Sequence, residues 1–213
     1  MSAPPRVSSH ALRLVAVTDS LGGGIDGLAR RAAAAVTGGA TMLTLRLPEE
    51  SPRMLAEIAR ALRTAAPGVP LLVSDRVDVA LAVNADGVHV GANDLSASVV
   101  RRFAPERFII GASIGTMDEV ARAGGADFVA IGPVFAASSS GSDHVTMGVE
   151  QFSDVARACG VPAIAVGGVA PHNAGALMTA GASGVAVISA LFGADDPATA
   201  ARALRAAVDA SGR

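Results

Sequence analysis

Apolar residues along the chain fall into two alternating patterns. Short runs of Val, Leu, Ile and Ala have the character of buried strands, and the longer Ala-, Leu- and Arg-rich stretches repeat their apolar positions at helical spacing. The runs predict eight strands, at residues 14–18, 42–45, 71–74, 87–90, 108–112, 128–131, 163–166 and 184–188. The stretches predict eight helices, at residues 26–37, 51–66, 76–83, 96–103, 117–124, 149–158, 171–180 and 195–210. Strict alternation of strand and helix predicts an α/β fold with a parallel sheet.

Glycines recur where a predicted helix gives way to the next strand. Gly38-Gly39-Ala40, Gly124-Gly125-Ala126-Asp127 and Ala180-Gly181-Ala182-Ser183-Gly184 have this form, and Asn84-Ala85-Asp86-Gly87 varies it. A glycine just past a helix end can adopt the left-handed conformation that terminates the helix. The repetition predicts a single (β/α)8 barrel, or TIM barrel, over residues 1–213, with residues 1–10 as a flexible extension. A doubly wound open sheet is the alternative.

Composition agrees with a buried parallel sheet. The chain is 51% hydrophobic but only 3% aromatic, so small aliphatic residues supply the apolar surface. A net charge of −2 with scattered basic residues argues against nucleic acid or a membrane surface as a partner. The first apolar run is too short for a signal peptide, and the single Cys159 cannot form an internal disulfide, so a cytoplasmic location is expected.

The chain contains no lysine, and all 17 of its Lys and Arg residues are arginines. A compositional bias of the genome is a sufficient explanation. The chemical consequence holds in either case: a Schiff base needs a side-chain amine, so lysine-dependent aldolases and pyridoxal phosphate enzymes are excluded.

Polar residues and glycines follow the predicted strands. In a (β/α)8 barrel these positions share the carboxyl-terminal rim, where active sites lie. They are Asp19, Arg46, Asp75, Asp94, Ser113, Gly132-Pro133, Gly167-Gly168 and Ser189. Arg46 ends a strand expected to be buried, where an unpaired guanidinium is costly, so a substrate phosphate is favoured over a structural ion pair as its partner.

The last two strand ends predict a phosphate site. Gly167-Gly168 precede a helix that opens at Pro171-His172-Asn173, and Ser189 follows the final strand. Glycines let a phosphate approach backbone N–H groups, and a helix N-terminus favours its negative charge. The alternative is that these glycines only serve tight turns.

Asp75 and Asp94 follow neighbouring predicted strands. Two carboxylates there suit a hard cation such as Mg2+ that bridges substrate phosphates. As alternatives, Asp75 pairs with Arg46 or Arg76, and Asp94 caps the helix that begins near Ser96.

Residues 136–148 form a segment that is too long and polar for a routine turn and predicts a mobile lid over the rim. His144 within it is a candidate for ligand contact or proton transfer, with a solvated surface histidine as the alternative. His89 lies inside a predicted strand and is expected in the core or the barrel lumen.

The rim residues resemble the thiamine phosphate synthase/TenI superfamily over nearly the whole chain. The order and spacing of eight segments carry the resemblance: Val17-Thr18-Asp19, Thr44-Leu45-Arg46, Ser74-Asp75-Arg76, Gly87-Val88-His89-Val90-Gly91-Ala92-Asn93-Asp94-Leu95, Gly111-Ala112-Ser113, Ile131-Gly132-Pro133-Val134-Phe135, Ala165-Val166-Gly167-Gly168-Val169 and Gly184-Val185-Ala186-Val187-Ile188-Ser189.

The resemblance implies a Mg2+-dependent transferase of thiamin biosynthesis. Such enzymes join a hydroxymethylpyrimidine diphosphate to a thiazole phosphate and release pyrophosphate, through a pyrimidine carbocation that the thiazole nitrogen captures. By position, Asp75 and Asp94 match the family's metal ligands, Arg46 and Ser113 its diphosphate contacts, and Gly168, Ile188 and Ser189 its thiazole phosphate cradle. Thr44, Gly132, Gly167 and Val187 adjoin these positions and complete the predicted binding set. A homo-oligomer is compatible with the sequence.

The chain departs from the family pattern in two places. Where the second strand usually reads Gln-x-Arg-x-Lys, this chain has Thr44, Arg46 and Pro48; where Thr-x-Thr-Lys usually follows Gly-Pro-Val-Phe, it has Ala137-Ser138-Ser139-Ser140. Cationic contacts to the diphosphate are therefore missing. A TenI-like thiazole phosphate tautomerase remains an alternative, although Gly115 stands where that branch has a histidine. A non-catalytic thiazole-phosphate-binding protein is the other alternative.

Overall fold

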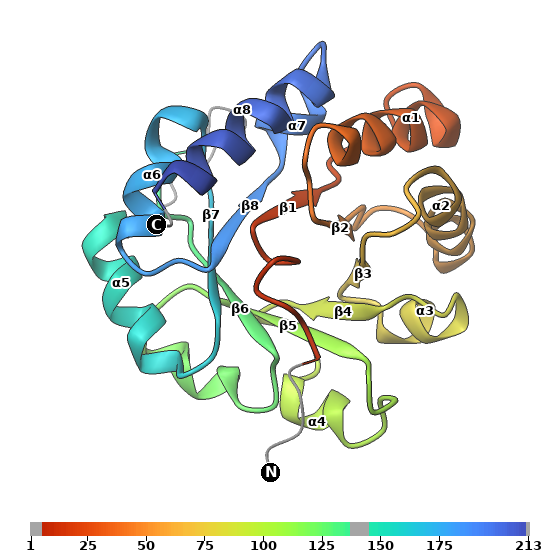
Figure 1. Cartoon of the computed structure of the whole chain (residues 1–213). Coiled ribbons are helices and arrows are strands. Elements are labelled where there is room, and N and C mark those ends of the chain that lie inside the picture. Colours follow the sequence, from red (N-terminus) through yellow and green to blue (C-terminus); the bar gives the residue numbers. More distant parts are fainter. Residues whose placement is uncertain (1–5, 137–144, 212–213) are drawn as a thin grey trace.

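Eight parallel strands close into a ring in the computed structural model, which describes residues 6–136 and 145–211 (Figure 1). The strands are β1 (Leu14–Val17), β2 (Met42–Leu45), β3 (Leu71–Ser74), β4 (Gly87–Val90), β5 (Ile109–Ile114), β6 (Phe128–Ile131), β7 (Ala163–Val166) and β8 (Gly184–Val187). Each strand pairs with the next, and β8 closes the ring on β1, with Val15 opposite Ala186. The predicted (β/α)8 barrel is confirmed.

Helices cover the outside of the ring (Figure 1). They are α1 (Gly24–Thr37), α2 (Pro52–Ala65), α3 (Val77–Ala82), α4 (Ala97–Arg101), the 3-10 helix η1 (Met117–Ala123), α5 (Gly148–Cys159), α6 (Pro171–Thr179), α7 (Ser189–Phe192) and α8 (Pro197–Ala210). Apart from shifts in bounds, two helices differ in kind from the sequence prediction: η1 is a 3-10 rather than an α-helix, and α7 is too short for periodicity to reveal. Within the described residues, none of the helices is long and apolar enough to cross a membrane.

Local sequence explains where several helices begin and end. Ser51 caps α2 by accepting the N–H of Met54, and Asp196 caps α8 through the N–H groups of Ala198 and Thr199. Gly39, Gly125 and Gly181 have φ values of 115°, 87° and 99°, which favour glycine. The left-handed glycines predicted between a helix end and the next strand are therefore confirmed at these three positions.

Two hydrophobic clusters fill the molecule. The larger one lies between the strands and the helices, and the smaller one, which includes Leu12, Val15, Met42, Leu72 and Phe128, fills the lumen. Alternate residues of each strand supply the two clusters.

The N-terminal segment closes the amino-terminal end of the lumen. Val7 and Leu12 are buried in the lumen cluster, and the first described residues, drawn in red, cross the middle of the ring in Figure 1. Arg6 forms an ion pair with Asp127, which directly precedes β6. Arg6 and Val7, which belong to the expected extension, therefore contact the barrel, whereas residues 8–10 are exposed. Because this end is filled, the lumen opens at the carboxyl ends of the strands.

Candidate functional site

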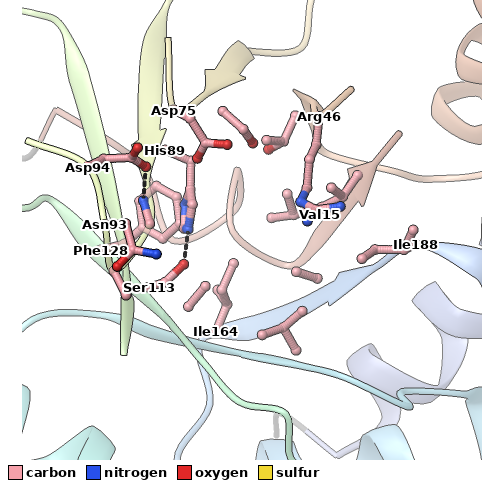
Figure 2. Close-up of a pocket in the computed structure, with 18 residues that line it drawn as sticks. Val15, Arg46, Asp75, His89, Asn93, Asp94, Ser113, Phe128, Ile164 and Ile188 are labelled. Carbon is pink, nitrogen blue, oxygen red and sulfur yellow. Dashed lines mark hydrogen bonds between the residues drawn. The ribbon is translucent and has the colours of Figure 1, made fainter. Parts of the chain in front are cut away.

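A cavity of about 440 Å³ opens at the carboxyl-terminal rim of the barrel (Figure 2). Its walls are apolar where strand residues face the lumen, at Val15, Val17, Phe128, Ala130, Ile164, Val166, Ala186 and Ile188. Its polar lining comes from the ends of β2 to β5 and the turn after β4: Thr44, Arg46, Ser74, Asp75, His89, Asn93, Asp94 and Ser113. An apolar cavity of this size with convergent polar groups is typical of a small-molecule site.

Asp75 and Asp94 lie in this cavity and influence each other (Figure 2). Asp75 has a left-handed backbone with φ 67°, which Asp adopts more readily than most residues, and its N–H donates to the carbonyl of His89 at 2.8 Å. One Asp94 carboxylate oxygen accepts the N–H of Gly91 at 2.6 Å. Desolvation, reinforced by the neighbouring Asp94 carboxyl and opposed by the charge of Arg46, raises the pKa of Asp75 from 3.8 to about 6.

The chemistry of these two carboxylates fits a hard divalent cation. Desolvation, followed by the neighbouring Asp94 carboxyl, raises the pKa of Asp75, and a proton or a bound cation would offset both effects. Among the described residues, no group of three or more His, Cys, Asp or Glu side chains could form a complete metal cage. Two carboxylates that leave the remaining positions to water and substrate phosphates are the arrangement that Mg2+ prefers.

Within the described residues, neither aspartate forms the ion pair or the helix cap considered as an alternative, although the charge of Arg46 acts on Asp75. No salt bridge there includes Asp75 or Asp94, since Arg76 pairs with Asp78 instead. Ser96, not Asp94, is the N-cap residue of α4. Both carboxylates are thus available to the cavity.

The raised pKa of Asp75 predicts a pH dependence of stability in metal-free protein. The folded state binds more protons than the unfolded state between pH 3.8 and about 6, so stability from this group falls as pH rises through that window and stays lower above it. Water screens the exposed carboxyl, so the effect is below about 1 kcal/mol, or about 2–4 °C in Tm. In thermal unfolding experiments with EDTA, the Tm of Asp75→Asn should rise relative to that of the wild type between pH 4 and pH 7.

Asp78→Asn is the control for that titration. The hydrogen bond from Arg76 lowers the pKa of Asp78, so this variant should lose stability relative to the wild type as pH rises. A constant Tm difference between Asp75→Asn and the wild type over pH 4–7 would contradict the raised pKa.

Arg46 is exposed at the rim, just after β2 ends at Leu45. The cost of burying its charge, on which the sequence argument rested, therefore does not apply. The described residues contain no salt bridge to Arg46, and it lines the same cavity as Asp75 (Figure 2). The buried Thr18 hydroxyl accepts the Arg46 N–H at 2.8 Å and donates to the Arg46 carbonyl at 3.1 Å, which fixes its backbone.

Ser113 and His89 form a hydrogen-bonded pair inside the cavity. His89 Nε2 lies 2.9 Å from Ser113 Oγ (Figure 2). Burial lowers the pKa of His89 to about 4, so the ring is neutral near pH 7. Ser113 lies within β5 rather than after it, because the strand extends to Ile114. A neutral ring can fix the direction of the Ser113 hydroxyl without adding charge to the cavity.

A second cavity of about 590 Å³ lies at the ends of β7 and β8 and contains Gly168 and Ser189. Gly168 has φ 61°, and a Cβ there would come within 2.5 Å of the Ala136 carbonyl oxygen. Asn173 orders the loop before α6, since its side chain accepts the Ala170 N–H at 2.8 Å and donates to the Gly168 carbonyl at 3.0 Å. A glycine backbone beside a helix N-terminus suits an anion.

The structure brings together most of the site residues expected from sequence. The first cavity contains Thr44, Arg46, Asp75, Asp94, Ser113 and Ile188, and the second contains Gly168 and Ser189. Gly132, Gly167 and Val187 line neither cavity; Val187 is buried in the cluster beneath the helices. His144 and most of the expected lid lie outside the described residues.

Sequence reasoning missed several residues that line the cavities. Asn93 and Phe128 line the first, and His172 and Asn173 line the second. Asn93 sits one position before Asp94 in a short turn, and Phe128 faces inward by strand alternation. The turn position of Asn93 and the inward-facing position of Phe128 can both be read from the sequence. Neither feature distinguishes a residue of a cavity wall from one in ordinary packing.

A family model, curated relatives and a solved structure place the chain in one family. The family model described as thiamine monophosphate synthase matches residues 14–191. A thiamine-phosphate synthase of Moorella thermoacetica is 43% identical over 198 residues, which cover 91% of this chain and 94% of that protein. One from Albidiferax ferrireducens is 41% identical over 96% of this chain and 95% of that protein. The solved structure of a thiamine phosphate pyrophosphorylase from Pyrococcus furiosus superposes with a TM-score of 0.84 at 34% identity, covering 95% of this chain and 98% of that one.

Proposed function

The chain belongs to the thiamine monophosphate synthase family, and on that basis we propose that it is a thiamine-phosphate synthase-type transferase. It joins a hydroxymethylpyrimidine diphosphate to a thiazole phosphate and releases pyrophosphate. The observation that carries this proposal is the rim cavity, in which the paired carboxylates of Asp75 and Asp94 lie beside Arg46 and above an apolar lumen.

Asp75 and Asp94 would hold Mg2+ in this proposal. When bound, the ion neutralises charge on the diphosphate as it departs. The mutual influence of the two carboxylates and their place in one cavity support this assignment. Arg46, on the neighbouring strand end, would contact the same diphosphate with its guanidinium.

The remaining residues would bind and orient the two organic substrates. Ser113, with its hydroxyl directed by His89, would contact the pyrimidine diphosphate, and the Gly168 and Ser189 backbone region would hold the thiazole phosphate. Ile188 and Ser189 are consecutive and line the first and second cavities respectively, so the two substrates would meet there.

The apolar walls of the first cavity would protect the reaction. A pyrimidine carbocation in water is captured by solvent, whereas Val15, Phe128 and Ile164 present no nucleophile. The neutral His89 ring adds no positive charge that would oppose cation formation.

The chain lacks positively charged side chains that the family pattern places near the diphosphate leaving group. Thr44 and Pro48 replace a glutamine and a lysine of the usual pattern, and the chain has no lysine elsewhere. Since one charged hydrogen bond contributes about 1.5–3 kcal/mol, we expect slower turnover than in a chain with both lysines. A thiazole phosphate tautomerase needs no metal, so the retained Asp75–Asp94 pair favours the synthase.

The decisive test mixes the purified protein with hydroxymethylpyrimidine diphosphate and thiazole phosphate and follows pyrophosphate release. We expect release that requires both substrates and Mg2+, with thiamine phosphate formed in equal amount. No product at high enzyme concentration would reject the synthase. Metal-independent deuterium uptake from solvent into a thiazole carboxylate phosphate would instead identify a tautomerase, and tight thiazole phosphate binding without either reaction a binding protein.

A further inference from the structure

The 3-10 helix η1 contacts two rim loops although none of its residues lines the first cavity. It packs against β5, α4 and α5. Arg122 Nη2 donates to the carbonyl of Gly91, after β4, at 2.6 Å, and the Glu119 carboxylate accepts the N–H of Gly115, after β5, at 2.6 Å. One short helix thus holds the chain at Gly91, two residues after His89, and at Gly115, two residues after Ser113.

The contact of Arg122 differs from those of other arginines in the chain. Arg31, Arg63 and Arg101 also donate to backbone carbonyls, but each is paired with an aspartate as well. Within residues 6–136 and 145–211, no salt bridge includes Arg122, which is partly buried. Its guanidinium is therefore placed by a loop carbonyl that is 31 residues away in sequence.

Gly91 lies between Arg122 and the two aspartates. Its N–H donates to Asp94 Oδ2 at 2.6 Å, and its carbonyl, which Arg122 binds, also accepts the Asp94 N–H at 3.4 Å. A Cβ at Gly91 would lie 3.1 Å from Asp94 Oδ2 and 3.6 Å from Asp75 Oδ1. Fixing the backbone of Gly91 therefore fixes one oxygen of Asp94 close to Asp75.

We propose that Arg122 is a positioning residue, which holds the turn at residues 91–94 so that Asp94 can share a divalent cation with Asp75. This inference rests on the metal site of the proposed function. Partners that orient a metal-binding carboxylate affect affinity by about 10- to 100-fold when they are removed. Glu119 steadies the adjoining loop after β5 in the same way, next to Ser113.

Amide hydrogen exchange tests the positioning directly and needs no activity. We expect Arg122→Met to speed exchange of the Gly91 N–H at least about tenfold, because the turn loses its external support. Arg122→Lys, which can still donate to the carbonyl, should recover part of the protection. The matched control is Arg63→Met, since Arg63 donates to the Asn84 carbonyl at the opposite end of the barrel; it should leave Gly91 unchanged.

Manganese binding, followed by electron paramagnetic resonance without substrates, tests the consequence for the cation. We expect Arg122→Met to weaken Mn2+ binding about tenfold or more, Arg122→Lys to restore part of the loss, and Arg63→Met to bind like the wild type. Unchanged Gly91 exchange in folded Arg122→Met overturns the proposal. Faster exchange with unchanged Mn2+ affinity overturns the link to Asp94.

The same measurements separate this inference from the synthase assignment. If the wild type makes no thiamine phosphate but both effects of Arg122→Met appear, the positioning role stands and the synthase falls. If the wild type is active and Arg122→Met changes neither quantity, the positioning role falls alone. Should Arg122→Met fail to fold, Arg122→Gln, which is too short to reach the carbonyl but keeps a polar end, decides by the same two criteria.

Discussion

Asp75→Asn should lower kcat/KM for Mg2+-dependent pyrophosphate release by about 100- to 1,000-fold, comparable to the loss of a group that stabilises transition-state charge. Asparagine keeps the shape of aspartate and also tolerates the left-handed backbone found at φ 67°. It removes one of the two charges that would hold the cation. Because the isolated pair repels itself, the variant should fold at least as well as the wild type.

Steady-state kinetics over a range of Mg2+ concentrations, together with thermal unfolding, checks this result. Asp78→Asn is the matched control: Asp78 is three positions away and its partner is Arg76, so its activity should stay within about twofold of the wild type. Activity of Asp75→Asn that remains within about threefold at saturating Mg2+ would remove Asp75 from the catalytic machinery.

Gly132→Ala should lower the free energy of unfolding by about 3 kcal/mol, which corresponds to a fall in Tm of about 6–12 °C. A Cβ at Gly132 would lie 2.1 Å from the Val166 carbonyl oxygen, so the end of β7 would have to move. That same carbonyl accepts the N–H of Val134 at 2.9 Å, and the movement would strain this bond too. The sequence places Gly132 among the binding residues, whereas its position favours a packing role.

Denaturant unfolding and thiazole phosphate binding, measured on the same variant below its Tm, distinguish the two roles. Gly22→Ala is the control, because a Cβ there meets neighbours at an ordinary 3.6 Å and the backbone is unstrained; its stability should change by less than about 0.5 kcal/mol. Unchanged stability of Gly132→Ala together with weaker ligand binding would restore the binding role.

The order of strands and helices could be predicted from the sequence because it depends on local periodicity. Runs such as residues 71–74 and 163–166 have the bounds of β3 and β7, and the glycine signals before the strands correspond to positive φ values. Rim positions followed from the same pattern, since a residue after a parallel strand must lie at the carboxyl end. Asp75, Asp94 and Arg46 were found in this way.

Interactions between distant segments could not be predicted from periodicity. The hydrogen bond between His89 and Ser113 depends on the register of β4 against β5, and the bond from Arg122 to Gly91 depends on where η1 packs. A residue next to a strand end is also not always in the cavity: Gly132 and Gly167 lie at the rim, but their space is taken up by neighbouring backbone.

By itself the sequence determined the (β/α)8 barrel, the family and the set of polar strand ends, because apolar runs, helical periodicity and the order of motifs can all be read along the chain without knowledge of spatial contacts. Tertiary structure alone decided which of those residues share a cavity, that Arg46 is exposed, that His89 is neutral, and that Arg122 supports the turn of Asp94. The physical reason is that burial, pKa and hydrogen-bond partners depend on atoms that closure of the ring brings close together. These atoms belong to residues far apart in the sequence, and their separation carries no periodic signal.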